Sequence, residues 1–355
     1  MEEAAGDQEP GEPGPLARIA AAARASLTEA GLERLEGEIA GRRMVLWRGG
    51  SGPDLVLLHG SGQQAGSWAA VVPGLVQDHT LHVLDLPGHG ESAPEKGILP
   101  MDTVVEGVET YLLGLENEAV LVGNSMGAWL ATILAHRHPD RVQRIVIVNG
   151  GALLNVPAEG LTLMPANREQ ARKVMEALRA PESPPLSDEL LDDIVLRSRN
   201  GPIGRMMQDM QGLMAHLLDG RLHEVEIPVD ILWGESDRLI PLDYARRMES
   251  QLPRARLTVL ERCGHIPASE CPERFGAALR EILERPPPDR SKSEGGEAEQ
   301  RRRGEAESTD SVGEPGNPEG EEPPEEATDE TADEEESVDR EEGPDGGTRA
   351  PEEIP

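Results

Sequence analysis

The sequence predicts an α/β protein with a mostly parallel central sheet, helices on both faces of that sheet and a helical insertion between two strands. Three observations support this prediction. Short apolar runs typical of buried strands alternate with segments of helical periodicity. One strand–helix junction carries the motif Gly-Asn-Ser-Met-Gly at residues 123–127. Between about residues 153 and 222 the strand signals stop and only helix-like patterns remain.

The 355 residues fall into three parts of different composition. Residues 1–15 are acidic and rich in Gly and Pro, and residues 288–355 are dominated by Glu, Asp, Gly, Pro and Ser. We expect a disordered leader and a disordered acidic tail, because neither segment can bury enough apolar surface to fold. Residues 16–287 carry the apolar patterns and predict one α/β domain, with a helical cap at about residues 153–222.

The formal net charge of −33 argues against nucleic acid or an anionic membrane surface as a partner. No apolar run approaches the roughly 20 residues that a membrane-spanning helix needs. We expect a small-molecule substrate as the partner, and the sequence leaves the oligomeric state open.

The chain contains two cysteines, Cys263 and Cys271. We interpret them as neither a disulfide framework nor a metal site, so the expected compartment is the reducing cytoplasm. Neither a metal ion nor a cofactor is expected.

The expected elements alternate between strand and helix along most of the chain, which favours a parallel sheet. They are a helix (Leu16–Ala30), a hairpin-like pair of strands (Leu35–Trp47), a strand (Leu55–Leu58), a helix (Trp68–Val76), a strand (Leu81–Leu84), a helix (Met101–Leu115), a strand (Ala119–Val122), a helix ending before Pro139, a strand (Arg144–Val148), the insertion, a strand (Val229–Trp233), a helix (Leu242–Gln251), a strand (Leu257–Leu260) and a last helix ending near Leu283. In a parallel sheet with this order, the insertion would cover the carboxyl ends of the strands.

The motif at residues 123–127 predicts a catalytic serine. Gly-x-Ser-x-Gly between a buried strand and a helix is typical of a sharp turn that exposes the hydroxyl of Ser125. Glycines two residues to either side allow the strand and the helix to pass closely.

A serine nucleophile requires a base and an acid that orients the base. His265 is the candidate base, because it follows the last predicted strand at the carboxyl edge of the sheet, where the loops converge. Asp237 is the candidate acid, because it follows another strand and because Asn149 occupies the alternative position. Glu235 and Asp243 lie near Asp237 and remain alternatives that could be solvated or cap a helix.

Two backbone N–H groups are expected to stabilise a developing oxyanion. The first belongs to Met126, which directly follows the serine. The second is assigned to Ser61 in the loop His-Gly-Ser-Gly at residues 59–62, and Gly60 of this loop is a candidate substrate contact. A plain glycine-rich turn is the alternative interpretation of the loop.

These motifs together resemble proteins of the α/β-hydrolase fold over about residues 35–284. The matching segments are His59–Gly62 with Trp68, Asp85–Ser92, Gly123–Gly127, Trp233–Asp237 and Gly264–Pro267, in this order. The resemblance implies that Ser125, Asp237 and His265 form a triad, with Ser61 and Met126 as the oxyanion hole. Ser at 125 in place of Asp distinguishes the chain from the haloalkane dehalogenases and epoxide hydrolases of this fold.

A narrower similarity links the chain to carbon–carbon bond hydrolases of aromatic degradation. It rests on Asn124, the His-Gly-Ser-Gly loop and cap segments at residues 165–168 and 187–191. In that case Arg197 would bind the carboxylate of a dienoate substrate. A solvated helix residue is the alternative role for Arg197.

The cap lacks aromatic residues from Gly151 to Leu222 and holds six of the eleven methionines. We expect at least half of them to pack the cap onto the sheet. Any that line a pocket would suit an aliphatic or small acyl group. The sequence therefore predicts a serine hydrolase of small carboxylic ester-type substrates, with a carbon–carbon bond hydrolase or a non-catalytic binding protein as alternatives.

Overall fold

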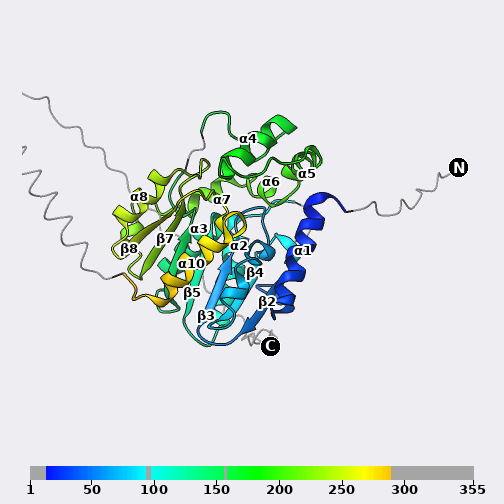
Figure 1. The fold of residues 1–355 in the computed structure, drawn as a ribbon. Helices are drawn as coiled ribbons and strands as arrows, with labels where there is room; N and C mark the ends of the chain where they lie inside the picture. Colours follow the sequence, from blue (N-terminus) through cyan, green and yellow to red (C-terminus); the bar gives the residue numbers. More distant parts are fainter. Residues whose placement is uncertain (1–12, 93–96, 156–157, 289–355) are drawn as a thin grey trace, which may run out of the picture. The chain divides into compact units, whose positions relative to one another are not determined.

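The structure is a computed structural model that describes residues 13–92, 97–155 and 158–288 (Figure 1). Most of the predicted leader and all but the first residue of the predicted acidic tail lie outside these ranges. Within the described ranges, no helix is long and apolar enough to cross a membrane.

An eight-stranded sheet forms the centre of the fold, in the order β1-β2-β4-β3-β5-β6-β7-β8. Its strands are β1 (Glu33–Ile39), β2 (Arg42–Gly50), β3 (Asp54–Leu58), β4 (Thr80–Asp85), β5 (Ala119–Asn124), β6 (Val142–Val148), β7 (Val229–Gly234) and β8 (Ala255–Leu260). The pairs β1–β2 and β2–β4 are antiparallel, and all other neighbours are parallel. The mostly parallel sheet predicted from the sequence is confirmed.

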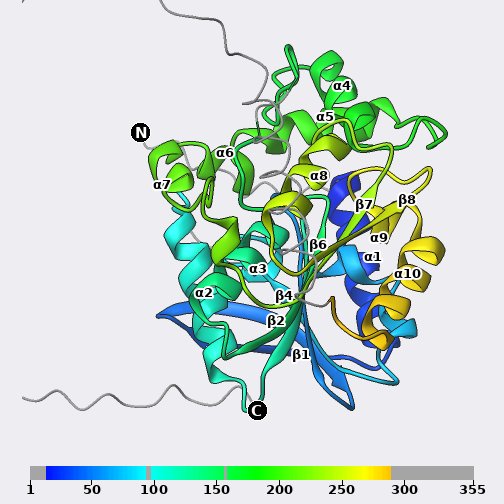
Figure 2. The same cartoon turned by 90° about the vertical axis from the view of Figure 1, so that its left-hand side faces the viewer.

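Helices cover both faces of the sheet (Figure 2). One face carries α2 (Met101–Gly114), α3 (Met126–Arg137) and α8 (Leu242–Gln251), and the other carries α1 (Pro15–Glu29), α9 (Pro267–Glu270) and α10 (Pro272–Glu284). Alternate residues of one strand enter the two cores: Val56 and Leu58 face the first, Leu55 and Leu57 the second. Burial on both faces explains why such strands are continuous apolar runs.

One predicted helix is wrong. The structure has two short 3-10 turns, η1 (Ala65–Trp68) and η2 (Val72–Gly74), where the sequence predicts a helix over Trp68–Val76. Pro73 lacks the N–H that a continuous helix requires, and it lies at the start of the second turn. Trp68, Val71 and Leu75 are nevertheless buried, so the apolar spacing identifies the inward face correctly.

The helical insertion connects β6 to β7, which are neighbours in the sheet. It contains α4 (Arg168–Leu178), α5 (Asp188–Ser198), α6 (Pro202–Met206) and α7 (Met210–Ala215), and its described part has no strand. It contacts the loops that follow four parallel strands. The contacts are Met206 with Ser61 after β3, Arg205 with Leu99 after β4, Ala177 with Arg238 after β7, and Leu178 with His265 after β8. The insertion therefore lies over the carboxyl edge of the sheet.

Asp85, the last residue of β4, joins two of the loops at this edge. Its carboxylate accepts hydrogen bonds from the backbone N–H groups of Ala65 and Glu91, both at 2.6 Å. Burial raises the pKa of Asp85 to about 6, and the two backbone hydrogen bonds only partly offset this effect.

The raised pKa of Asp85 predicts a pH-dependent contribution to stability. The folded protein keeps this proton at pH values where the unfolded chain, with a pKa near 4, has lost it. The contribution is fully present below about pH 4 and is lost as the pH rises through about 6. The Asp85→Asn variant lacks this contribution. Between about pH 4 and 7, the slope of its free energy of unfolding against pH should therefore be more positive than the slope of the wild type. Urea titrations measure this slope, and equal slopes in both proteins would contradict the assignment.

Candidate active site

Ser125 occupies a strained turn between β5 and α3. Its φ of 54° and ψ of −115° place a non-glycine residue at positive φ, as a serine-exposing elbow requires. Its N–H donates to the carbonyl of Val148 at 2.9 Å, which ties the turn to the end of β6.

The two flanking glycines have no room for a side chain. A Cβ atom at Gly123 would lie 2.1 Å from the carbonyl oxygen of Gly127, and one at Gly127 would lie 2.0 Å from the carbonyl oxygen of Leu58. Both distances are far inside van der Waals contact, so any other residue would push the strand, the helix and the β3 loop apart. The spacing of the motif is thus a packing requirement.

Asp237 and His265 meet although 28 positions separate them. Nδ1 of His265 lies 2.7 Å from Oδ2 of Asp237, and each residue is 3% exposed. Oδ1 of Asp237 accepts the N–H groups of Leu239 and Ile240 at 2.9 and 3.0 Å. An ionised carboxylate only accepts hydrogen bonds, and the other neighbours of Asp237 all donate to it. Nδ1 of His265 therefore carries the proton in this contact. Nε2 of His265 is left as the basic nitrogen.

Two asparagines connect the acid and the base to neighbouring strands. Asn149, with φ at 46°, donates from Nδ2 to Oδ2 of Asp237 at 2.8 Å and accepts the N–H of Gly234 at 3.0 Å. Asn124, next to the candidate nucleophile, donates to the carbonyl of His265 at 2.9 Å. The sequence identifies position 149 only as a missing acid, whereas the structure gives it an orienting contact.

Among the described residues, no hydrogen bond joins the Ser125 hydroxyl to the His265 imidazole. The contact from Asn124 places the loop of His265 beside the serine turn. Hydrogen bonds between catalytic groups are often long before substrate is bound.

The loop at residues 59–62 passes directly beside the candidate nucleophile. A Cβ atom at Gly60 would lie 3.1 Å from Cβ of Ser125, so glycine allows this close approach. The N–H of Gly60 is occupied by Oε1 of Gln63 at 3.2 Å, and Nε2 of Gln63 donates to Asn124. Gln63 was missed in the sequence, where only its position after the glycine-rich loop could have indicated it.

His59 sets the direction of the candidate oxyanion donor. The carbonyl of Gly60 accepts from Nδ1 of His59 at 2.8 Å and from the N–H of Gln63 at 3.1 Å. Nε2 of His59 accepts the N–H of Leu86, which establishes the tautomer, and burial holds its pKa well below the usual value. In a trans peptide the N–H of Ser61 points opposite to the carbonyl of Gly60 and therefore away from these donors. The other expected donor, the N–H of Met126, lies in the first turn of α3, where N–H groups have no acceptor within the helix.

Glu270 on α9 holds the loop of His265 and was not identified from the sequence. Its carboxylate accepts the N–H of Gly264 at 2.6 Å, the hydroxyl of Ser183 at 2.6 Å and the N–H of Ala180. The backbone N–H of His265 donates to Leu178 at 2.7 Å. The insertion and the candidate base are thus bonded to each other, and no local pattern around Glu270 reveals this.

Cys263 and Cys271 form a disulfide, with Cα atoms 5.9 Å apart. The expectation that these cysteines are unpaired is therefore wrong. The chain reverses direction through α9 between β8 and α10, which brings two residues eight positions apart within disulfide distance. The enclosed loop carries His265 and Glu270.

The remaining candidates lie farther from this cluster or on the surface. Arg197 on α5 is paired with Asp193 at 2.6 Å, and its side chain is 50% exposed. Oδ2 of Asp193 also accepts the N–H of Leu16 at the start of α1. Glu235 and Asp243 are exposed, and Asp243 pairs with Arg246. The described residues contain no cluster of three or more His, Cys, Asp or Glu side chains that could hold a metal ion.

A comparison of the sequence with models of protein families agrees with this fold and site geometry. The model of the alpha/beta hydrolase family matches residues 55–278, and the chain belongs to this family. The matched segment includes Ser125, Asp237 and His265.

Two relatives of the chain are named for different activities. Pimeloyl-(acyl-carrier protein) methyl ester esterase of Nitrosomonas europaea is 31% identical over 240 residues, which cover 64% of this chain and 94% of the relative. A 2-hydroxy-6-oxononadienedioate/2-hydroxy-6-oxononatrienedioate hydrolase of Burkholderia vietnamiensis is 29% identical over 254 residues, covering 65% and 87%. The crystal structure of a meta-cleavage product hydrolase from Pseudomonas fluorescens IP01 superposes with a TM-score of 0.60 at 25% identity, covering 69% of this chain and 96% of that one.

Proposed function

We propose that this protein is a serine hydrolase that cleaves small carboxylic ester-type substrates. The observation that carries the proposal is the buried hydrogen bond between Asp237 and His265, which leaves Nε2 of His265 basic beside the turn that exposes Ser125.

Each residue has a distinct role in this mechanism. Nε2 of His265 takes the hydroxyl proton as Ser125 attacks the carbonyl carbon, and the N–H groups of Ser61 and Met126 stabilise the oxyanion. Asp237 stabilises the imidazolium that forms. His265 then protonates the leaving alcohol, and a water molecule deprotonated by the same nitrogen releases the acid from Ser125. No metal or cofactor takes part in these steps.

The surroundings of the loop favour an aliphatic acyl group. Sδ of Met206, from α6, lies 3.7 Å from the hydroxyl of Ser61, and Ile203 of the same helix packs against Gly62. The helical insertion thus contributes flexible aliphatic side chains at the candidate oxyanion loop, and we assign it the role of a cap over the substrate.

Replacing the nucleophile tests the proposal directly. A screen of aryl esters of increasing acyl length should reveal turnover by the wild type, and Ser125→Ala should lower kcat/KM by at least about 10³-fold, since the remaining groups cannot replace the nucleophile. A fluorophosphonate should label the wild type and not the variant. Equal ester turnover by both proteins would rule out Ser125. A wild type that neither labels nor turns over any ester would favour a binding protein on the same fold.

Glu270 should affect the rate through the position of His265. In the wild type, three donors share the carboxylate of Glu270, and Glu270→Gln replaces one of its oxygens with an N–H₂ group that cannot accept. The loop of His265 should therefore shift. We expect kcat to fall about 10- to 100-fold and KM to change less than about threefold. Glu273→Gln, an exposed position three residues away, is the matched control. If kcat falls in both variants, or in neither, the positioning role is refuted.

Carbon–carbon bond hydrolysis is the second candidate, because relatives named for it match as much of this chain as the esterase does. In this reaction Arg197 would bind the carboxylate of a dienoate. The guanidinium is already paired with Asp193, so it would have to share or exchange this partner.

Arg197→Ala separates the two reactions. If the protein hydrolyses dienoates, the variant should lose at least about tenfold in kcat/KM on a dienoate and keep its rate on an uncharged aryl ester, because only the dienoate offers a carboxylate. Parallel losses on both substrates would instead indicate a structural role through Asp193 and α1.

The expected cytoplasmic location loses its main support. Disulfides are rare in the cytoplasm, and Cys263 is joined to Cys271. We therefore infer an oxidising compartment for the folded protein.

A further inference from the structure

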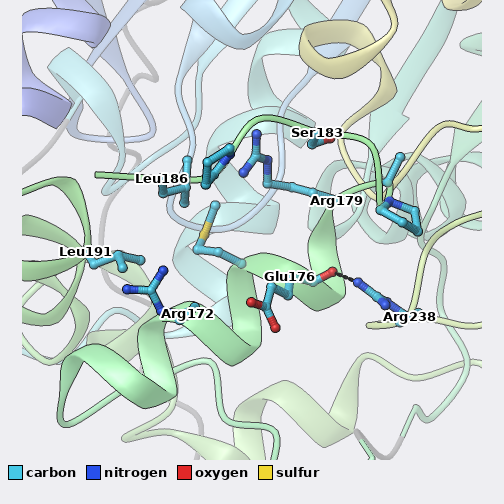
Figure 3. Close-up of a pocket in the computed structure, with 11 residues that line it drawn as sticks. Arg172, Glu176, Arg179, Ser183, Leu186, Leu191 and Arg238 are labelled. Atoms are coloured by element: carbon cyan, nitrogen blue, oxygen red, sulfur yellow. Dashed lines mark hydrogen bonds between the residues drawn. The ribbon is translucent and has the colours of Figure 1, made fainter. Parts of the chain in front are cut away.

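A cavity of about 360 Å³ lies within the helical insertion (Figure 3). Its walls come from the second half of α4, the loop at residues 179–187, the start of α5 and Arg238 after β7. None of the candidate catalytic residues lines it, so it is distinct from the site around Ser125.

Three arginines line this cavity against one acid, in a chain with a large excess of acids. They are Arg172, Arg179 and Arg238, and the acid is Glu176. Arg172 pairs with Asp188 at 3.1 Å, and Arg238 donates to the backbone carbonyl of Glu176.

The side chain of Arg179 is half-buried and has no hydrogen bond or ion pair to any described residue. Figure 3 shows it extending across the cavity toward Leu186. A guanidinium presents a planar fork of donors that matches a carboxylate or phosphate, and here the fork is free.

Apart from Ser183, the rest of the lining is apolar. Met175 and Leu191 come from the two helices, and Leu186, Ala180 and two prolines come from the loop between them. The arginines would therefore be complementary to an anionic group, and the apolar side chains to an aliphatic chain attached to it.

The loop that closes the cavity is held from outside. Ala180 and Ser183 both donate to the carboxylate of Glu270, and the hydroxyl of Ser187 caps α5 by accepting the N–H of Leu190 at 3.2 Å. These contacts fix the start of the loop to Glu270 and its end to the first turn of α5.

We propose that this cavity is a second binding site, which takes a small organic anion with a carboxylate or phosphate on an aliphatic chain. Arg179 binds the anionic group, Arg172 and Arg238 add positive charge, and Met175 and Leu186 contact the chain. The proposal does not depend on hydrolysis at Ser125.

Calorimetric titration of the full-length Ser125→Ala protein tests the site without turnover. The ligands are octanoate, octyl phosphate, octanol and inorganic phosphate. Octanoate or octyl phosphate should bind at least tenfold more tightly than octanol and inorganic phosphate do. Whichever of octanoate and octyl phosphate binds more tightly identifies the anionic group as a carboxylate or a phosphate. Binding of octanol as tight as that of both anions would show a purely apolar pocket and overturn the proposal, as would no binding at all.

Variants assign the binding to this cavity. Arg179→Gln should weaken binding of the preferred anion at least fivefold, and Arg179→Lys should weaken it less, because the charge remains while the fork is lost. Arg199→Gln changes an exposed arginine of the same insertion outside the cavity and should bind as the parent does. Because the side chain of Arg179 has no partner among the residues that the structure describes, its loss should leave the fold intact, which circular dichroism checks. Unchanged affinity in a folded Arg179→Gln protein would place the anion elsewhere, including the site around Ser125, and refute the proposal.

Discussion

The close backbone contact around Ser125 is the constraint on which the site depends. Strand β5, helix α3 and the loop after β3 approach so closely that Gly123 and Gly127 cannot carry side chains. Ser125 takes a positive φ because the chain must turn from strand to helix within this contact, and its N–H bond to Val148 holds the turn against β6. Tight packing thus supplies the energy that keeps a strained residue in place.

Burial of an acid beside a histidine requires that the polar groups be satisfied. Asp237 accepts two backbone N–H groups, an asparagine amide and the imidazole, which compensates for its removal from water. Asn149 is the member of this set that reaches from a neighbouring strand, at the position where another acid could have stood. As an amide it can both donate to Asp237 and accept from Gly234, which a carboxylate could not do.

The insertion supports the candidate base as well as covering the sheet. Leu178, near the end of α4, accepts the N–H of His265, and Glu270 joins the loops on either side of this contact. The disulfide closes the same segment of chain. The insertion and the loop of His265 are thus joined by a few short hydrogen bonds, and the loop at residues 179–187 is also a wall of the arginine-lined cavity.

The sequence by itself determined the class of fold, the order of the strands along the chain and the identity of Ser125, Asp237 and His265 as candidates. Apolar runs and glycine spacing are local consequences of burial and close packing, so they can be read without coordinates. The contacts of Gln63, Asn149 and Glu270 could not be read in this way, because each joins segments brought together only by the folded sheet and the insertion. The same holds for the disulfide, since a reversal through a short helix, and not the spacing of the cysteines, brings them within bonding distance.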